Sequence, residues 1–209
     1  FLADPRITEL PRWLWWLILH GVILRLRPAR AAKKYQTIWT ARGSPLLATS
    51  QAQVQALQEE VMGRPGSKSM VVTLGMRYGQ PSIATGLEQL REAQAQRLII
   101  LPLYPQYASA TTGSTFDAVS EVLKRWRWVP DLHFISHYYD HPAYIRALVT
   151  HIQRHWTTQG SQPDKLLFSF HGIPKRFSVA GDPYFYHCQA TARLVVEQLQ
   201  LREDRWQVV

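Results

Sequence analysis

The sequence predicts an α/β protein built on a doubly wound parallel sheet, and two observations carry that prediction. Short apolar runs recur along the chain, and each is continuous rather than alternating, which is typical of parallel strands covered on both faces. The runs are residues 70–75, 97–103, 132–136 and 165–170, followed by a last one at residues 206–209. Helical patterns lie between them, and strands that alternate with helices imply right-handed crossover connections.

Each intervening helix has a start signal or an apolar stripe of its own. Ser44 followed by Pro45 predicts a helix start, because a capping residue precedes a proline at the first helical position. Further helices are predicted from the prolines at residues 81, 142 and 183, and along the apolar stripe at residues 116–126. Cys188 lies on the apolar stripe of the last helix and is predicted to be a core thiol.

The longest apolar run, residues 13–26, reads WLWWLILHGVILRL. It is too short to span a bilayer, and His20, Gly21 and Arg25 interrupt it. It also lacks the small-residue cleavage site of a signal peptide. We therefore expect an amphipathic helix that packs inward or borders an apolar pocket. Contact with a membrane surface is the alternative, because tryptophans stand at positions 13, 15 and 16.

Composition and charge limit the classes of protein. Hydrophobic residues make up 46% of the 209 positions and charged residues 19%, which is typical of a folded globular chain. The net charge is +9, and an acid-free basic stretch contains Arg25, Arg27, Arg30, Lys33 and Lys34. Such a stretch attracts phosphates, carboxylates or an anionic membrane surface, or it is a solvated helix face. Nucleic-acid binding is disfavoured because the stretch contains no recognised reading motif.

The domain organisation is predicted from a polar, helix-breaking segment at residues 157–163. It marks a boundary between a first domain at residues 1–157 and a second domain at residues 158–209. Because the chain begins without methionine and stops inside a predicted strand, we expect it to be part of a longer protein. Cys188 is the only cysteine, which excludes an internal disulfide or a cysteine cluster for zinc or iron–sulfur binding and suits a reducing cytosol.

Chemistry is expected at the carboxyl ends of the strands, where open α/β sheets bind their ligands. No glycine-rich dinucleotide fingerprint or Walker loop follows a strand, so a nucleotide cofactor is not expected. His171 follows an apolar run, and Gly172 and Pro174 then turn the chain. A neutral imidazole there can bind a metal or take a proton near pH 7, although a structural histidine is the alternative. Tyr104 and Tyr107 form either an aromatic wall for a flat apolar ligand or ordinary core.

Several motifs together resemble the ferrochelatase family of the Gram-negative bacterial type, over essentially the whole chain. They are FLADPR, WWLILHGVIL, RYG, LPLYPQY followed by ATTGS, and SFHGIP followed by AGDPY. The resemblance implies two Rossmann-like, chelatase-type domains, the first without its opening strand and the second truncated. It also implies insertion of ferrous iron into protoporphyrin IX to form protoheme, the last step of heme synthesis.

The same resemblance implies roles for individual residues. His171 corresponds to the catalytic, metal-site histidine of the family. Porphyrin-binding positions match Arg27, Arg30, Tyr35 and Ser44 on the propionate side, and Arg77, Tyr78 and Tyr104 along the pocket. The glutamate that faces the histidine in the family lies beyond Val209, which leaves the folding and activity of this chain alone undecided.

Partners and rivals follow from the same comparison. We expect protoporphyrin IX and ferrous iron as substrates, no tightly bound cofactor and no nucleic acid. A cluster cysteine of some relatives falls at Ser109, so no iron–sulfur cluster is expected. The protein is expected to be a cytoplasmic monomer, with peripheral membrane contact as an alternative. The rival functions are a chelatase for another metal or tetrapyrrole, of coproporphyrin or sirohydrochlorin type, and a non-catalytic tetrapyrrole-binding module.

Overall fold

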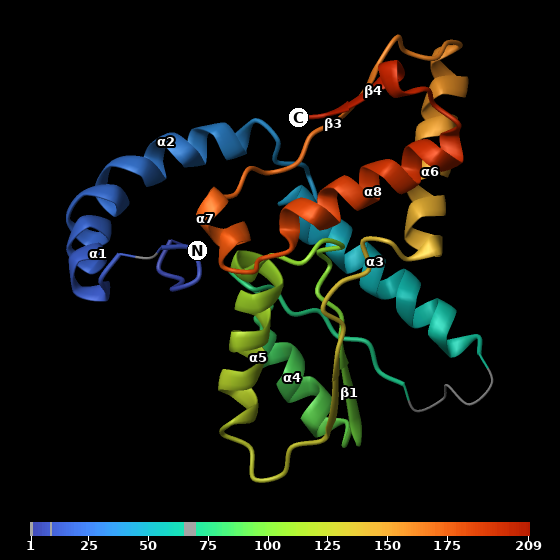
Figure 1. The fold of residues 1–209 in the computed structure, drawn as a ribbon. Helices are drawn as coiled ribbons and strands as arrows, with labels where there is room; N and C mark the ends of the chain where they lie inside the picture. The colour runs from blue at the N-terminus through green and yellow to red at the C-terminus, as the bar shows by residue number, and fades with distance from the viewer. Residues whose placement is uncertain (1, 9, 65–69) are drawn as a thin grey trace. The chain divides into compact units, whose positions relative to one another are not determined.

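The computed structural model describes residues 2–8, 10–64 and 70–209, the side chains of Ala29 and Arg30 excepted. Helices and short strands alternate, which confirms the predicted α/β class (Figure 1). The helices are α1 (Arg12–Ile18), η1 (Leu19–Ile23), α2 (Leu24–Gln36), α3 (Pro45–Met62), α4 (Ile83–Glu92), η2 (Ser109–Gly113), α5 (Ser114–Leu123), α6 (Pro142–Gln159), α7 (Lys175–Val179), α8 (Tyr184–Leu199) and η3 (Glu203–Arg205). The strands are β1 (Arg97–Ile100), β2 (Asp131–Phe134), β3 (Leu166–Phe168) and β4 (Trp206–Val208).

The chain divides into two compact units. The first comprises Phe1–Leu98 and Ser114–His133, and the second comprises Ile99–Gly113 and Phe134–Val209. The predicted domain boundary between residues 157 and 158 stays a prediction.

Strand pairing in the described residues forms two two-stranded sheets. β1 pairs with β2, and β3 pairs with β4 in parallel, with Leu166 opposite Trp206 and Phe168 opposite Val208. Four of the five predicted strands are thereby confirmed, each shorter than its apolar run. A parallel pair needs a long connection, and α8 occupies the one between β3 and β4.

The fifth predicted strand, residues 70–75, is wrong: this segment has no strand assignment in the structure. Its backbone instead forms hydrogen bonds with the side chain of Gln58 in α3. The Val72 N–H donates to Gln58 Oε1 at 2.7 Å, and Gln58 Nε2 donates to the Met70 carbonyl at 3.2 Å. Only at the end of the segment does a bridge form, between Met76 and Ser82.

The first unit has its core where α4 packs against α5. Leu87 of α4, Leu98 of β1, and Val119 and Leu123 of α5 are buried. Ser82 caps α4, because its Oγ accepts from the Thr85 N–H at 3.1 Å.

The helix predicted after Ser44 is confirmed as α3, with Pro45 at its first position. The prediction that the Ser44 side chain caps this helix is wrong, because that side chain makes no capping hydrogen bond. Its backbone still contributes, because the Ser44 carbonyl accepts from the Ala48 N–H at 3.0 Å. The proline alone is therefore enough to set φ at the helix start.

The apolar run at residues 13–26 is helical, as predicted, and spans α1, η1 and the start of α2. Leu19 is its one buried side chain in the described residues. Trp13, Trp16 and Leu26 are 68%, 59% and 65% exposed, so the run does not pack wholly inward. No described helix is both long and apolar enough to cross a bilayer.

The second unit has its core between α6 and α8. Ile145 and Val149 of α6 meet Val195 of α8, and Phe168 of β3 packs against this cluster. Figure 1 shows β3 and β4 running beside α8. Cys188 is 4% exposed on α8, which confirms the predicted core thiol.

Candidate functional site

His171 lies where the strand prediction puts it, in the turn between β3 and α7. The pairing of the two strands continues towards it, because Val209 N donates to Phe168 O at 2.9 Å and Phe170 N donates to Val209 O at 3.3 Å. The His171 side chain is exposed. The strand therefore delivers a solvent-accessible imidazole at its carboxyl end.

One hydrogen bond defines the tautomer of this imidazole. His171 Nδ1 lies 2.8 Å from the carbonyl oxygen of Gly172. A carbonyl oxygen can only accept, so Nδ1 carries a hydrogen, and in the neutral form of the ring the lone pair is on Nε2. A lone pair on Nε2 can bind a metal ion or accept a proton.

Tyr184 is the first residue of α8. Burial, followed by the effects of Cys188, raises the pKa of Tyr184 to about 12, against an opposing effect of the His171 backbone. Burial also raises the pKa of Cys188 to about 11. Both groups therefore keep their protons at neutral pH.

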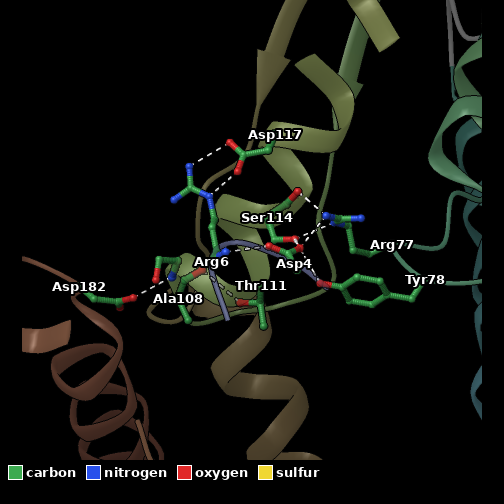
Figure 2. Close-up of polar contacts among 10 residues, drawn as sticks. Asp4, Arg6, Arg77, Tyr78, Ala108, Thr111, Ser114, Asp117 and Asp182 are labelled. Atoms are coloured by element: carbon green, nitrogen blue, oxygen red, sulfur yellow. Dashed lines mark hydrogen bonds and ion pairs between the residues drawn. The ribbon is translucent and has the colours of Figure 1, made fainter. Parts of the chain in front are cut away.

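Asp182 anchors the start of α8. Its Oδ1 accepts from the Tyr184 N–H at 3.0 Å, and its Oδ2 accepts from the Ser109 N–H at 2.7 Å. Figure 2 shows this carboxylate reaching the loop at Ala108. Asp182 is 8% exposed, and a buried carboxylate with both oxygens occupied fixes the backbone on either side of it.

A histidine and aromatic cluster adjoins the same helix. The ring of buried His187 stacks on Tyr139 with centroids 3.8 Å apart and meets His137 edge-on at 5.1 Å. Its Nδ1 accepts from the Tyr107 N–H at 3.2 Å, which requires an unprotonated Nδ1. Burial, and then the nearby His137, lower the pKa of His187, against opposing effects of Asp140 and Asp182. The histidine is thus held neutral.

A polar network in the first unit gathers around Asp4 (Figure 2). Arg77 Nη2 donates to Asp4 Oδ2 at 2.6 Å, and the Tyr78 hydroxyl donates to the same oxygen at 2.7 Å. The Ser114 hydroxyl also donates to it, and Arg77 Nε donates to the Ser114 carbonyl at 3.0 Å. The structure therefore brings the predicted pair Arg77 and Tyr78 together, on a carboxylate whose side chain is 2% exposed.

The neighbours of Asp4 stabilise the ionised form of its carboxylate. Burial alone would raise the pKa of Asp4, but hydrogen bonds from Ser114, Tyr78 and the Arg6 N–H, with the Arg77 charge, lower it overall. The pKa of Tyr78 is raised, mainly by burial. A hollow of about 580 Å³ opens beside Asp4 and Arg77. The residues that line this hollow include both acidic and basic side chains, such as Asp117 and Arg77.

The remaining predicted residues are spread over the two units. Arg27 and Tyr35 are exposed on α2, and Ser44 is half-buried just before α3, all in the first unit. The side chain of Arg30 lies outside the described residues. Tyr104 follows β1 in the second unit and is 39% exposed. Among the described side chains, no group of three histidine, cysteine or acidic residues forms a metal site.

Sequence reasoning missed three residues that organise these surroundings: Asp4, Ser114 and Asp182. Asp4 and Asp182 each precede a proline in the motifs FLADPR and AGDPY. An aspartate directly before a proline was the available signal for both. Ser114 carried no comparable signal, because its role depends on a partner 110 positions away.

Comparisons with known proteins agree with these motifs. The family model described as Ferrochelatase matches residues 1–209. A ferrochelatase of Nitrosococcus oceani is 55% identical over 208 residues, covering 100% of this chain and 56% of its own length. One of Thioalkalivibrio sulfidiphilus is 52% identical over 209 residues, with 100% and 56% covered, and one of Nitrosomonas europaea is 46% identical over 208 residues, with 100% and 57% covered. The chain thus spans about half the length of these curated relatives, and it belongs to the ferrochelatase family.

Proposed function

We propose that this chain is part of an enzyme that inserts ferrous iron into protoporphyrin IX, the last step of heme synthesis. Membership of the ferrochelatase family supports the reaction. The observation that carries its chemistry is the His171 imidazole at the end of β3, exposed and with its lone pair on Nε2. The reaction replaces the two pyrrole N–H protons by the metal ion, so a site for it needs a base, a metal ligand or both.

His171 supplies such a group. Its Nε2 accepts a pyrrole proton, binds the incoming iron, or does each in turn. A bent macrocycle directs a pyrrole lone pair out of the ring plane, towards the metal, and binding energy at the periphery compensates for that strain. Iron is a substrate in this scheme, and no tightly bound cofactor or iron–sulfur cluster is part of it.

The porphyrin-binding residues belong to the same proposal. Arg27, Arg30, Tyr35 and Ser44 hold the propionates, because guanidinium, hydroxyl and phenol groups all donate to carboxylates. Tyr104 offers an aromatic face to the macrocycle. Arg77 and Tyr78 contribute through the polar network at Asp4, which engages the charged end of Arg77 and the hydroxyl of Tyr78. The two Rossmann-like domains, at residues 1–157 and 158–209, are the proposed framework.

We also propose a cytoplasmic monomer that touches the membrane surface through α1, η1 and α2. Exposed Trp13, Trp16 and Leu26 lie on the same segment as the exposed cations Arg25 and Lys33. Cosedimentation of the full-length protein with anionic phospholipid vesicles tests this contact. Trp16→Ala should weaken vesicle binding and Trp128→Ala, which replaces an equally exposed tryptophan, should not. Equal binding by both variants would contradict the contact.

The reaction itself is tested with the full-length protein and a set of metal and ring pairs. Fe²⁺ and Co²⁺ are each offered with protoporphyrin IX, coproporphyrin and sirohydrochlorin, and metal insertion is followed by absorbance. We expect the highest kcat/KM for Fe²⁺ with protoporphyrin IX. A higher value for another pair would change the assigned substrates. Tight porphyrin binding without insertion of any metal would contradict an enzymatic function.

A further inference from the structure

We propose that His187 is a positioning residue for the aromatic loop, residues 104–107, which it holds through the backbone of Tyr107. The inference deepens the proposed function and rests on it, because that function assigns Tyr104 of this loop to the face of the macrocycle. His187 itself does not need to touch the porphyrin. The histidine lies in α8, and it belongs to the second unit together with the whole loop.

The first support is the way in which the backbone of the aromatic loop is held. The loop has no helix or strand assignment, so its position depends on single contacts with other segments. The Pro105 carbonyl accepts from the Tyr138 N–H at 2.9 Å, and the Tyr107 N–H donates to His187 Nδ1 at 3.2 Å. Pro105, whose φ is fixed, stands between Tyr104 and Tyr107, so a shift at one end of the loop reaches the other.

The second support is the firm placement of His187 itself. Its ring is 9% exposed, stacks on Tyr139 and meets His137 edge-on. Thr191, one turn further along α8, accepts from Gln106 Nε2 at 2.9 Å. Thr191 therefore holds a side chain of the loop, whereas His187 holds a backbone group. Together they attach the aromatic loop to α8 at two successive residues.

The third support is the exposure of the ring that the loop presents. Tyr104 is 39% exposed, whereas Tyr107 is half-buried and His187 is buried. The loop is thus attached at one end and offers an accessible aromatic side chain at the other. Binding costs less when a loop already holds its bound position, because less conformational freedom is lost. Loss of the attachment should therefore appear as weaker porphyrin binding.

The attachment also requires a neutral His187. Nδ1 accepts from the Tyr107 N–H only while it keeps its lone pair, and protonation puts a hydrogen there instead. The titratable groups around the ring are His137, Tyr139, Asp140 and Asp182. Burial, and then His137, lower the pKa of the imidazole, and Asp140 and Asp182 oppose them. Because that pKa is lowered, the bond is intact at neutral pH and is lost as the pH falls through the folded-state value, below 6.5.

The test measures the dissociation constant of protoporphyrin IX from the full-length protein, without metal, by the quenching of tryptophan fluorescence. Two substitutions separate the hydrogen bond from the packing of the ring. His187→Gln keeps an acceptor for the Tyr107 N–H and removes the titration, whereas His187→Leu fills the site without an acceptor. His155→Leu is the matched control, because it makes the same change at an exposed histidine of α6.

At about pH 7.5, we expect His187→Leu to raise this dissociation constant about fivefold. His187→Gln and His155→Leu should leave it within about twofold of the wild type. Between about pH 7.5 and pH 5, the wild-type constant should rise about twofold or more relative to that of His187→Gln, because only the wild type can lose the bond by protonation of the ring. The porphyrin propionates titrate in both measurements and cancel in the comparison.

Any of three outcomes would overturn the inference alone. In the first, His187→Leu binds the porphyrin as the wild type does, although Tyr104→Ala binds it at least about fivefold more weakly. In the second, His187→Gln and His187→Leu weaken binding equally, as expected of a residue that only fills space. In the third, the wild type and His187→Gln respond identically to acid. Unchanged binding by Tyr104→Ala would instead overturn the proposed role of Tyr104, and the positioning role with it.

Discussion

Replacing Asp4 by asparagine should destabilise the first unit more than any other single change of charge within that network. The variant keeps the shape of the side chain but removes the charge that Arg77 Nη2 contacts at 2.6 Å. In the wild type, Oδ2 accepts from three side-chain donors, of Arg77, Tyr78 and Ser114, and Oδ1 accepts from the Arg6 N–H. An amide NH2 group in place of either oxygen therefore faces at least one donor from which it cannot accept a hydrogen bond.

The magnitude follows from burial. Breaking a buried ion pair by removing one partner costs about 3–5 kcal/mol, because the other charge stays uncompensated. The Asp4 side chain is 2% exposed, whereas Arg77 is 25% exposed and water can partly solvate it. We therefore expect the lower end, a loss of about 3 kcal/mol in the free energy of unfolding. Asp117→Asn is the control: its pair with Arg6 is 46% and 36% exposed and should contribute about 1 kcal/mol or less.

The assay is urea unfolding of the full-length protein at several pH values. Because the pKa of Asp4 is lowered in the folded state, its contribution is complete above the ordinary aspartate value of 3.8 and disappears as the pH falls through the lower, folded value. The difference between wild type and Asp4→Asn should therefore shrink only below about pH 4. A loss under about 1 kcal/mol at pH 7, or one equal to that of Asp117→Asn, would refute the reasoning.

Two further predictions concern the second unit. Thr112 Oγ1 is buried without a hydrogen-bond partner among the described residues, whereas Thr191 Oγ1 donates to a carbonyl at 3.0 Å and accepts from an amide at 2.9 Å. Thr112→Val should leave the free energy of unfolding unchanged or raise it by about 1 kcal/mol, and Thr191→Val should lower it by about 1–2 kcal/mol; equal losses in urea unfolding would contradict this. For His187, whose pKa is lowered, stability is complete above the unfolded value of about 6.5 and declines as the pH falls below it. His187→Gln should flatten that decline between pH 7 and pH 5 in unfolding measurements, and an unchanged slope would show that the histidine is not responsible.

The histidine turn could be predicted from sequence because its signals are local. A continuous apolar run predicts a buried strand, and Gly172 and Pro174 end it within a few residues. Those signals lie within one short stretch of sequence, so the strand could be predicted without knowing that it pairs with β4. The same reasoning failed at residues 70–75, which are as apolar as the confirmed strands. A strand needs a neighbouring backbone to pair with, whereas the backbone of residues 70–75 forms hydrogen bonds with the side chain of Gln58.

The polar surroundings of the site could not be predicted for a different reason. Asp4 and Arg77 are 73 positions apart, and Asp4 and Ser114 are 110 apart. A charged residue before a proline has many common roles, and no local pattern identifies a distant partner.

The most direct test of the central claim is the rate of iron insertion by full-length His171→Ala, measured beside His155→Ala. Both variants remove an exposed imidazole from the second unit, and only the first removes the one at the end of β3. The account predicts at least about a hundredfold loss of kcat for His171→Ala with protoporphyrin still bound, and no loss for His155→Ala. Turnover by His171→Ala within a few-fold of the wild type would contradict it.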